Sequence, residues 1–347
     1  MLKLTRPSFK DLFMFALKFP EFNWHILYKK FTDFWALNII IAASLISLTF
    51  NSNAQDYLTF GQRIEELIKS KDPSVKLVSK NDDGTIVITF PCNGKVCEQG
   101  FYKIPLARPN VFMNVVVLTE HEAKNKKVIL VVKGGDANVD IKGLFTANRG
   151  GMVYLYKNED LFLNSNISLV DTGCPTDKLL SYNNCADHYR KSAQYTNDFK
   201  SIIDFLKDKY QFQKFFIFGH SSGGISSKWL SVHLEDELSG AINSSAMTSS
   251  RGSDNLAHSV VGFDMDKIKI PVLNISHKDD KCLTTPYHTV KSYSKNNLVT
   301  VLGGGSSGPL CEDTNHHSFE GRQRGVARAI AKWVSTGEVQ SIVDSDE

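Results

Sequence analysis

The chain lacks a surplus of positive charge. Its 347 residues carry a formal net charge of +3. The first 54 residues account for all of it, with six Lys and Arg against three Asp and Glu, so the remainder is close to neutral. A domain without a basic surplus has no strong electrostatic attraction for a phosphate backbone. We therefore expect no nucleic-acid partner.

Motifs for metals and nucleotides are also missing. The sequence has neither a Cys-x-x-Cys pair nor a His-rich cluster, which disfavours a zinc site. The glycine run Gly303–Gly305 is not followed by the Gly-Lys-Ser/Thr of a phosphate loop, and no helix pattern comes after it. We expect neither a metal nor an organic cofactor.

Long apolar runs are scarce, and one near the N-terminus stands out. Lys29 and Lys30 precede the apolar stretch Phe34–Phe50, and the small residues Ser52–Ala54 follow it. This order is typical of a signal peptide, and residues 1–54 are predicted to be one. The alternative is an uncleaved anchor, although the apolar stretch is at the short limit for crossing a bilayer. We expect an exported protein, periplasmic or secreted, which contacts a membrane only if this segment is uncleaved.

Cysteines are few, and all of them follow residue 54. An even number in an exported chain favours disulfides over free buried thiols. Six cysteines allow fifteen pairings, of which we expect the sequential one. It joins Cys92 to Cys97, Cys174 to Cys185, and Cys282 to Cys311.

Strand and helix patterns alternate along the rest of the chain. Strands are expected at Thr85–Phe90, Val111–Leu118, Lys127–Val132, Ile167–Val170, Phe215–Phe218, Ala241–Ile242, Val272–Ile275 and Leu298–Leu302, and helices around Phe199–Leu206 and Val326–Val334. This predicts an α/β domain over 110–335 with a mostly parallel sheet flanked by helices and no room for a large lid domain. Residues 55–109 are expected to add a short helix at Leu58–Lys69 and edge strands, and 336–347 to form a C-terminal tail that is frayed after Gln340.

One strand pattern ends in a motif that is typical of a catalytic nucleophile. The apolar run Phe215–Phe218 leads into Gly-x-Ser-x-Gly at Gly219–Gly223, and a helix pattern follows. Such a strand-turn-helix raises the central serine, here Ser221, above the sheet as a nucleophile. Both glycines are expected because a Cβ would clash in so tight a turn. A second match around Ser306 is followed by proline and no helix pattern, so we expect it to be fortuitous.

A serine hydroxyl needs a base, and the base needs an orienting carboxylate. In a parallel sheet these groups lie on loops after the carboxyl ends of strands. Asp279 and Asp280 follow the strand at Val272–Ile275, and His316 and His317 lie between the last strand and the closing helix. The sequence therefore offers an acid and a base in the right places, each with a neighbour of the same type.

These segments together resemble the α/β-hydrolase superfamily, in particular its exported esterase-like members related to dienelactone hydrolases. The resemblance covers roughly residues 110 to 335. Its order of serine, acid and histidine implies Ser221, Asp280 and His317 as the catalytic triad. Asp279, His316 and the strand-ending Asp171 remain alternatives. A disulfide between Cys282 and Cys311 would tie the acid loop to the histidine loop.

The resemblance also implies an oxyanion hole formed by the backbone N–H groups of Ser222 and Gly135. Lys133 stands where the family usually has histidine. The implied activity is cleavage of carboxylic esters through an acyl-enzyme, with a small-molecule ester or acyl compound as substrate. A peptidase, thioesterase or acyltransferase could use the same triad, and a non-catalytic hydrolase-like binding protein is the alternative of another class.

Overall fold

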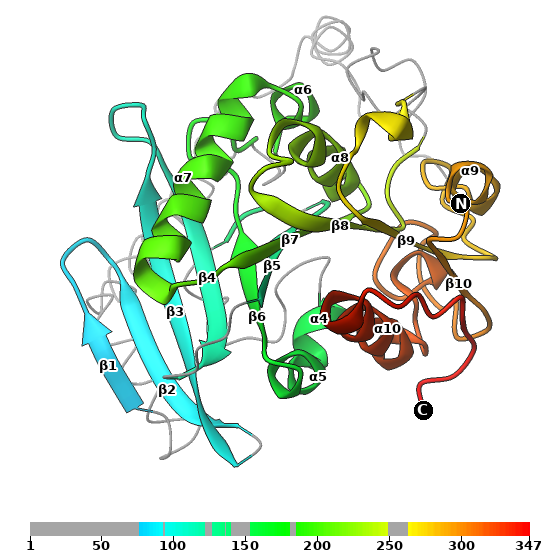
Figure 1. The fold of residues 1–347 in the computed structure, drawn as a ribbon, viewed down its shortest axis with the longest axis horizontal. Helices are drawn as coiled ribbons and strands as arrows, with labels where there is room; N and C mark the ends of the chain where they lie inside the picture. Colours follow the sequence, from blue (N-terminus) through cyan, green and yellow to red (C-terminus); the bar gives the residue numbers. More distant parts are fainter. Residues whose placement is uncertain are drawn as a thin grey trace, which may run out of the picture. The chain divides into compact units, whose positions relative to one another are not determined.

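A computed structural model describes residues 76–92, 94–121, 127–135, 137–139, 153–180, 185–248 and 263–347 of the chain (Figure 1). All of them belong to one compact unit, residues 68–347. The predicted signal peptide at 1–54 and the predicted helix Leu58–Lys69 lie outside the described residues. Within those residues, no helix is both long and apolar enough to cross a membrane.

The centre of this unit is an eleven-stranded mixed sheet in the order β1-β2-β3-β4-β6-β5-β7-β8-β9-β10-β11. Pairing is parallel from β6 through β5 to β11 and antiparallel from β1 to β4 and between β4 and β6. The strands are β1 Lys76–Lys80, β2 Ile86–Cys92, β3 Lys95–Pro105, β4 Phe112–Glu120, β5 Lys127–Val132, β6 Ile167–Thr172, β7 Lys214–His220, β8 Leu238–Ser244, β9 Val272–His277, β10 Leu298–Val301 and β11 Ile342–Val343. This mostly parallel sheet is the predicted one.

Helices cover both faces of the parallel strands, because these strands are apolar on both sides. The helices are α4 Val153–Lys157, α5 Glu159–Asn164, α6 Asp187–Arg190, α7 Ala193–Tyr210, α8 Gly223–His233, α9 Tyr287–Tyr293 and α10 Gln323–Thr336. Leu130 and Ile217 face a buried cluster with α7, whereas Ile129 and Phe218 face a second cluster with α4, α5 and α10. Figure 1 shows the resulting three layers.

The predicted frayed tail is wrong. Ile342–Val343 forms β11 and pairs with Thr300 and Val301 of β10 in parallel register. Beyond the strand, the Asp346 carboxylate accepts a hydrogen bond from the N–H of Gly325 at 2.9 Å, close to the start of α10. A two-residue apolar run is too short to give a strand pattern in sequence, and here it is stabilised by pairing with β10 and by burial of Val343 in the core.

The six cysteines form the three sequential disulfides Cys92–Cys97, Cys174–Cys185 and Cys282–Cys311. The first closes the hairpin between β2 and β3. The third joins the loop after β9 to the loop after β10, both of which lie at the carboxyl ends of parallel strands. These two loops carry the predicted acid and base.

Candidate active site

Ser221 lies in a sharp turn between β7 and α8. Its φ of +53° is in the left-handed region, which is unfavourable for a residue with a Cβ. Three backbone hydrogen bonds hold this conformation. The N–H of Ser221 donates to Ser244 at 3.1 Å, and its carbonyl accepts from the N–H groups of Gly224 and Met247, both at 3.0 Å. The surrounding turn therefore fixes Ser221 in a conformation that an unsupported serine would leave.

The glycines on either side of Ser221 are required by close backbone contacts. A Cβ on Gly219 would lie 2.4 Å from the carbonyl oxygen of Gly223. A Cβ on Gly223 would lie 2.2 Å from the carbonyl oxygen of Val132 at the end of β5. Neither backbone oxygen could move aside without breaking the turn. The steric reason inferred from the sequence therefore holds at both positions.

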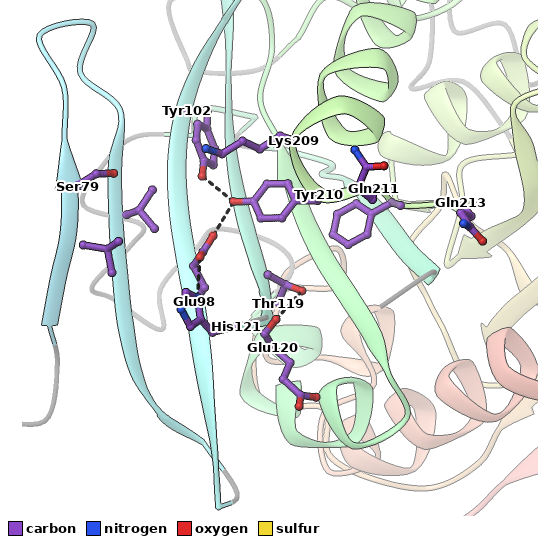
Figure 2. Close-up of a pocket in the computed structure, with 13 residues that line it drawn as sticks. Ser79, Glu98, Tyr102, Thr119, Glu120, His121, Lys209, Tyr210, Gln211 and Gln213 are labelled. Carbon is purple, nitrogen blue, oxygen red and sulfur yellow. Dashed lines mark hydrogen bonds and ion pairs between the residues drawn. The ribbon is translucent and has the colours of Figure 1, made fainter. Parts of the chain in front are cut away.

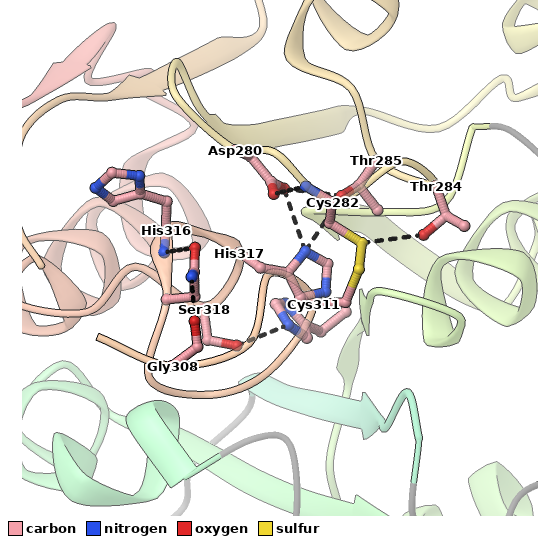
Figure 3. Close-up of a disulfide and its surroundings, with 11 residues drawn as sticks. Asp280, Cys282, Thr284, Thr285, Gly308, Cys311, His316, His317 and Ser318 are labelled. Carbon is pink, nitrogen blue, oxygen red and sulfur yellow. Dashed lines mark hydrogen bonds and ion pairs between the residues drawn. A yellow bond between two sulfur atoms is a disulfide. The ribbon is translucent and has the colours of Figure 1, made fainter. Parts of the chain in front are cut away.

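An acid and a base meet on the two loops that Cys282–Cys311 joins (Figure 3). Oδ2 of Asp280 lies 3.1 Å from Nδ1 of His317, and both side chains are buried. Asp280 also accepts hydrogen bonds from the N–H of Cys282 at 2.9 Å and from the hydroxyl of Thr285 at 2.8 Å. With these three partners, the carboxylate is held in one orientation toward the imidazole.

The other ring nitrogen of His317 is the one that a general base would use. Nε2 is buried, and within the described part of the chain it has no hydrogen-bond partner. A neutral imidazole that donates from Nδ1 to a carboxylate has its lone pair on Nε2. His317 can therefore accept a proton at Nε2 while Asp280 fixes its tautomer.

The competing acids and bases have other partners. The backbone of Asp279 contacts the rings of two histidines. Its N–H donates a hydrogen bond to Nδ1 of His277 at 3.0 Å, and its carbonyl oxygen lies 3.2 Å from Nδ1 of His316. The His277 and His316 rings stack with centroids 4.1 Å apart, and Figure 3 shows His316 directed away from His317. Asp171 forms a buried ion pair with Lys133 at 3.3 Å. The structure thus brings together Asp280 and His317 and none of the alternatives.

His220, the residue before Ser221, is buried and lies within hydrogen-bond distance of two serine hydroxyls. Its Nδ1 lies 3.1 Å from the hydroxyl of Ser244, and the hydroxyl of Ser318 lies 3.3 Å from its Nε2. Its ring centroid is 5.0 Å from that of His317. Burial, and then the nearby His317, hold the pKa of His220 well below its usual value of 6.5. His220 is therefore a neutral ring that packs against His317.

The loop after β5 contacts the tight turn at residues 219–223 that carries Ser221, which is called the elbow below. A Cβ on Gly134 would lie 2.8 Å from the Cβ of Ser221. The N–H of Gly135 donates to the hydroxyl of Ser222 at 3.3 Å, and Gly135 has a φ of +60°. The two predicted oxyanion donors thus come from segments in direct contact beside Ser221.

The side chain of Lys133 holds the loop after β5 in place through two polar contacts. The side chain is almost completely buried, pairs with Asp171 at 3.3 Å and donates to the carbonyl of Asn138 at 3.1 Å. The backbone carbonyl of Lys133 accepts from Arg190, which is also buried. From the sequence, Lys133 is only a departure from the family pattern, and no signal marks Thr285 as a partner of Asp280. The Lys133–Asp171 pair joins segments far apart in sequence, whereas the contact of Thr285 with Asp280 depends on how a single loop folds back on itself.

Removing the Cys282–Cys311 disulfide, by replacing both cysteines with serine, is expected to lower the free energy of unfolding by about 3–4 kcal/mol. The bond spans 29 residues, and closing a loop of that length restricts the unfolded chain by about this amount. We also expect a lower kcat for the ester cleavage that the family resemblance implies, because the disulfide constrains the loop whose Cys282 N–H donates to Asp280.

Urea unfolding and ester hydrolysis would measure the two effects. The matched control is the double serine variant at Cys92 and Cys97, which span only 5 residues. It should lose about 2 kcal/mol and keep its kcat. Equal losses of kcat in both variants would contradict a role for Cys282–Cys311 in positioning the acid.

Comparison with known proteins agrees with this architecture. A family model described as "Serine aminopeptidase, S33" matches residues 185–305, about a third of the chain. That stretch contains both Ser221 and Asp280. No curated protein sequence matches the chain.

Solved structures with a similar fold share little sequence with the chain. Est1E from Butyrivibrio proteoclasticus is 13% identical, with 67% of this chain and 96% of that one aligned and a TM-score of 0.47. A putative dienelactone hydrolase from Klebsiella pneumoniae is 12% identical over 69% and 99%, also with a TM-score of 0.47. XC6422 from Xanthomonas campestris, a lidless α/β serine hydrolase, is 12% identical over 69% and 95% with a TM-score of 0.44.

The sheet order, the elbow at the end of β7 and the matching family model together define a class. The chain has the α/β-hydrolase fold. Over residues 185–305 it resembles the family of serine aminopeptidases that the matching model describes.

Proposed function

We propose that the chain is an exported serine hydrolase that cleaves carboxylic esters through an acyl-enzyme. The observation that carries the proposal is the buried Asp280–His317 hydrogen bond, with Nε2 of His317 left as a buried lone pair. Ser221 supplies the nucleophile from a turn whose backbone conformation is held by three hydrogen bonds. This division of roles among three groups is the one that serine hydrolysis requires.

In the first half of the proposed reaction, the Ser221 hydroxyl attacks the ester carbonyl while Nε2 of His317 takes its proton. The carbonyl oxygen becomes an oxyanion. The donors proposed to stabilise it are the N–H of Ser222 and the N–H of Gly135, which must release the Ser222 hydroxyl to do so. His317 then returns the proton to the departing alcohol, and an acyl-Ser221 remains. Asp280 stabilises the imidazolium throughout and keeps its own charge.

In the second half, His317 takes a proton from water, and the resulting hydroxide attacks the acyl carbonyl. Collapse of the second tetrahedral intermediate breaks the bond to Ser221 Oγ, which recovers its proton from His317. The products are a carboxylic acid and the free enzyme. Small-molecule esters are the proposed substrates.

A peptidase is the second candidate, since the matching family model is described as a serine aminopeptidase. The same nucleophile and base would then release an amine instead of an alcohol. Rates on p-nitrophenyl esters and on aminoacyl p-nitroanilides would separate the two activities. Export remains part of the proposal. It is supported by three disulfides, which persist in oxidising compartments.

Labelling with a fluorophosphonate probe is expected to modify Ser221, because only a serine with an adjacent base reacts readily with it. Mass spectrometry of the digested protein locates the label. The control is Ser306, which is exposed in the loop after β10 and is not part of a strand-to-helix turn. A label on Ser306, or none on folded and oxidised protein, would contradict the proposal.

A further inference from the structure

A cavity lies beside the start of β7, at the opposite end of that strand from Ser221. Its volume is about 540 Å³, within the range of small-molecule sites. Residues 211–213, which line it, immediately precede β7, whereas Ser221 follows that strand's last residue. The remaining lining comes from β1–β4, the C-terminal end of α7 and His121 after β4 (Figure 2). The cavity is therefore separate from the candidate active site.

A chain of hydrogen bonds crosses this cavity. The hydroxyls of Tyr102 and Tyr210 lie 2.6 Å apart, and Tyr210 donates to Oε1 of Glu98 at 2.9 Å. Oε2 of Glu98 lies 3.0 Å from Nδ1 of His121. Burial raises the pKa of Tyr102 to about 12 and also raises the pKa of Tyr210, so both hydroxyls keep their protons at neutral pH. Figure 2 shows this group of four side chains, which join β3, β4 and α7.

Charged groups of both signs line or border the cavity. Glu120 pairs with Lys95 at 2.8 Å, and the Glu98 carboxylate contacts the Tyr210 hydroxyl and the His121 ring. Nζ of Lys209 lies over the ring of Tyr102, 5.9 Å from its centroid. A ligand of either charge would meet groups of its own sign and disturb one of these pairs. A fully apolar ligand would shield the remaining acceptor sites of the Tyr102 hydroxyl and the Glu98 carboxylate from water without replacing those hydrogen bonds. These costs favour a neutral ligand that carries many hydroxyl groups.

The rest of the lining fits such a ligand. Val78, Val87 and Phe212 provide apolar surface, and Phe212 stacks on Tyr210 with ring centroids 5.3 Å apart. The amides of Gln211 and Gln213 add donors and acceptors on exposed side chains. Sugar rings combine hydroxyl groups with apolar C–H faces. We propose that this cavity binds a neutral oligosaccharide. The proposal does not depend on the chemistry of Ser221.

Isothermal titration of the purified full chain with xylotetraose, cellotetraose and maltotetraose tests the site. At least one of them should bind with a Kd between about 10 μM and 1 mM. Replacing Tyr210 by phenylalanine should weaken binding about tenfold or more, because it removes the hydroxyl that orders Glu98. The matched control is Tyr287→Phe, whose hydroxyl lies 3.0 Å from that of Thr300 outside the cavity.

Two further variants keep the result interpretable. Gln213→Ala changes an exposed side chain and should weaken binding several-fold without affecting folding, even if Tyr210→Phe is unstable. Ser221→Ala should bind the sugar normally, which separates this site from the candidate active site. Absence of binding by all three sugars would overturn the proposal, as would binding that Tyr210→Phe and Gln213→Ala leave unchanged. Preferential binding of tetramethylammonium or sulfate would overturn the assignment of a neutral ligand.

Discussion

Replacing Asp280 by asparagine is expected to lower kcat for ester cleavage by about 10⁴-fold with little change in KM. The asparagine amide can donate to Nδ1 of His317, which would place the ring proton on Nε2. The ring would then be unable to accept the proton of Ser221. The side chain keeps its size, so the packing around Thr285 and Cys282 should persist.

The matched control is the neighbouring Asp279→Asn. The Asp279 side chain is exposed, and its contacts with His277 and His316 use the backbone, which the substitution leaves intact. Its kcat should stay within about threefold of the wild type, as expected for a surface change. Steady-state kinetics on a p-nitrophenyl ester measures both variants. A large loss in Asp279→Asn with normal kinetics in Asp280→Asn would show that the acid is Asp279.

The sequence predicted the elbow well because its signals are local. An apolar strand, two glycines and a helix pattern stand within about twenty residues, and each has a steric or packing reason that can be stated without the fold. The choice between Asp279 and Asp280, or between His316 and His317, could only be argued from a family pattern. Which of two adjacent side chains faces the site depends on how two loops from different strands meet.

Other parts of the fold depended on contacts that the sequence does not display. Strand β3 contains Gly100 and several polar residues, and its pairing with β2 and β4 determines its conformation. The Lys133–Asp171 ion pair joins the ends of β5 and β6, which are adjacent only in the folded sheet. Local patterns predict elements, whereas the partners of buried polar groups follow from the order of the strands.

Lys228 on α8 has a buried side-chain amine. The residue is only 1% exposed. Its Nζ donates to the carbonyl of Met247 at 3.0 Å and lies 5.7 Å from the ring centroid of Tyr293. No carboxylate among the described residues forms an ion pair with it. Burial lowers the pKa of Lys228 from 10.5 to about 7.

This shift makes the stability of the protein depend on pH. Between pH 7 and about 10.4 the unfolded chain holds a proton on this lysine that the folded chain has lost, so stability rises with pH. Below pH 7 the folded protein must protonate a buried amine, and the full cost of about 5 kcal/mol applies. The cost disappears above the pKa of the unfolded chain.

Replacing Lys228 by methionine is therefore expected to increase the free energy of unfolding at pH 6 by about 2–4 kcal/mol. The gain is smaller than the full cost because the Met247 carbonyl loses its donor. It should shrink as pH rises and vanish near pH 10. Denaturant unfolding at several pH values measures this trend, and the exposed Lys291→Met on α9 should stay within about 0.5 kcal/mol at every pH. Destabilisation of Lys228→Met by the same amount at all pH values would mean that the hydrogen bond to Met247, and not the buried charge, determines the contribution of this lysine.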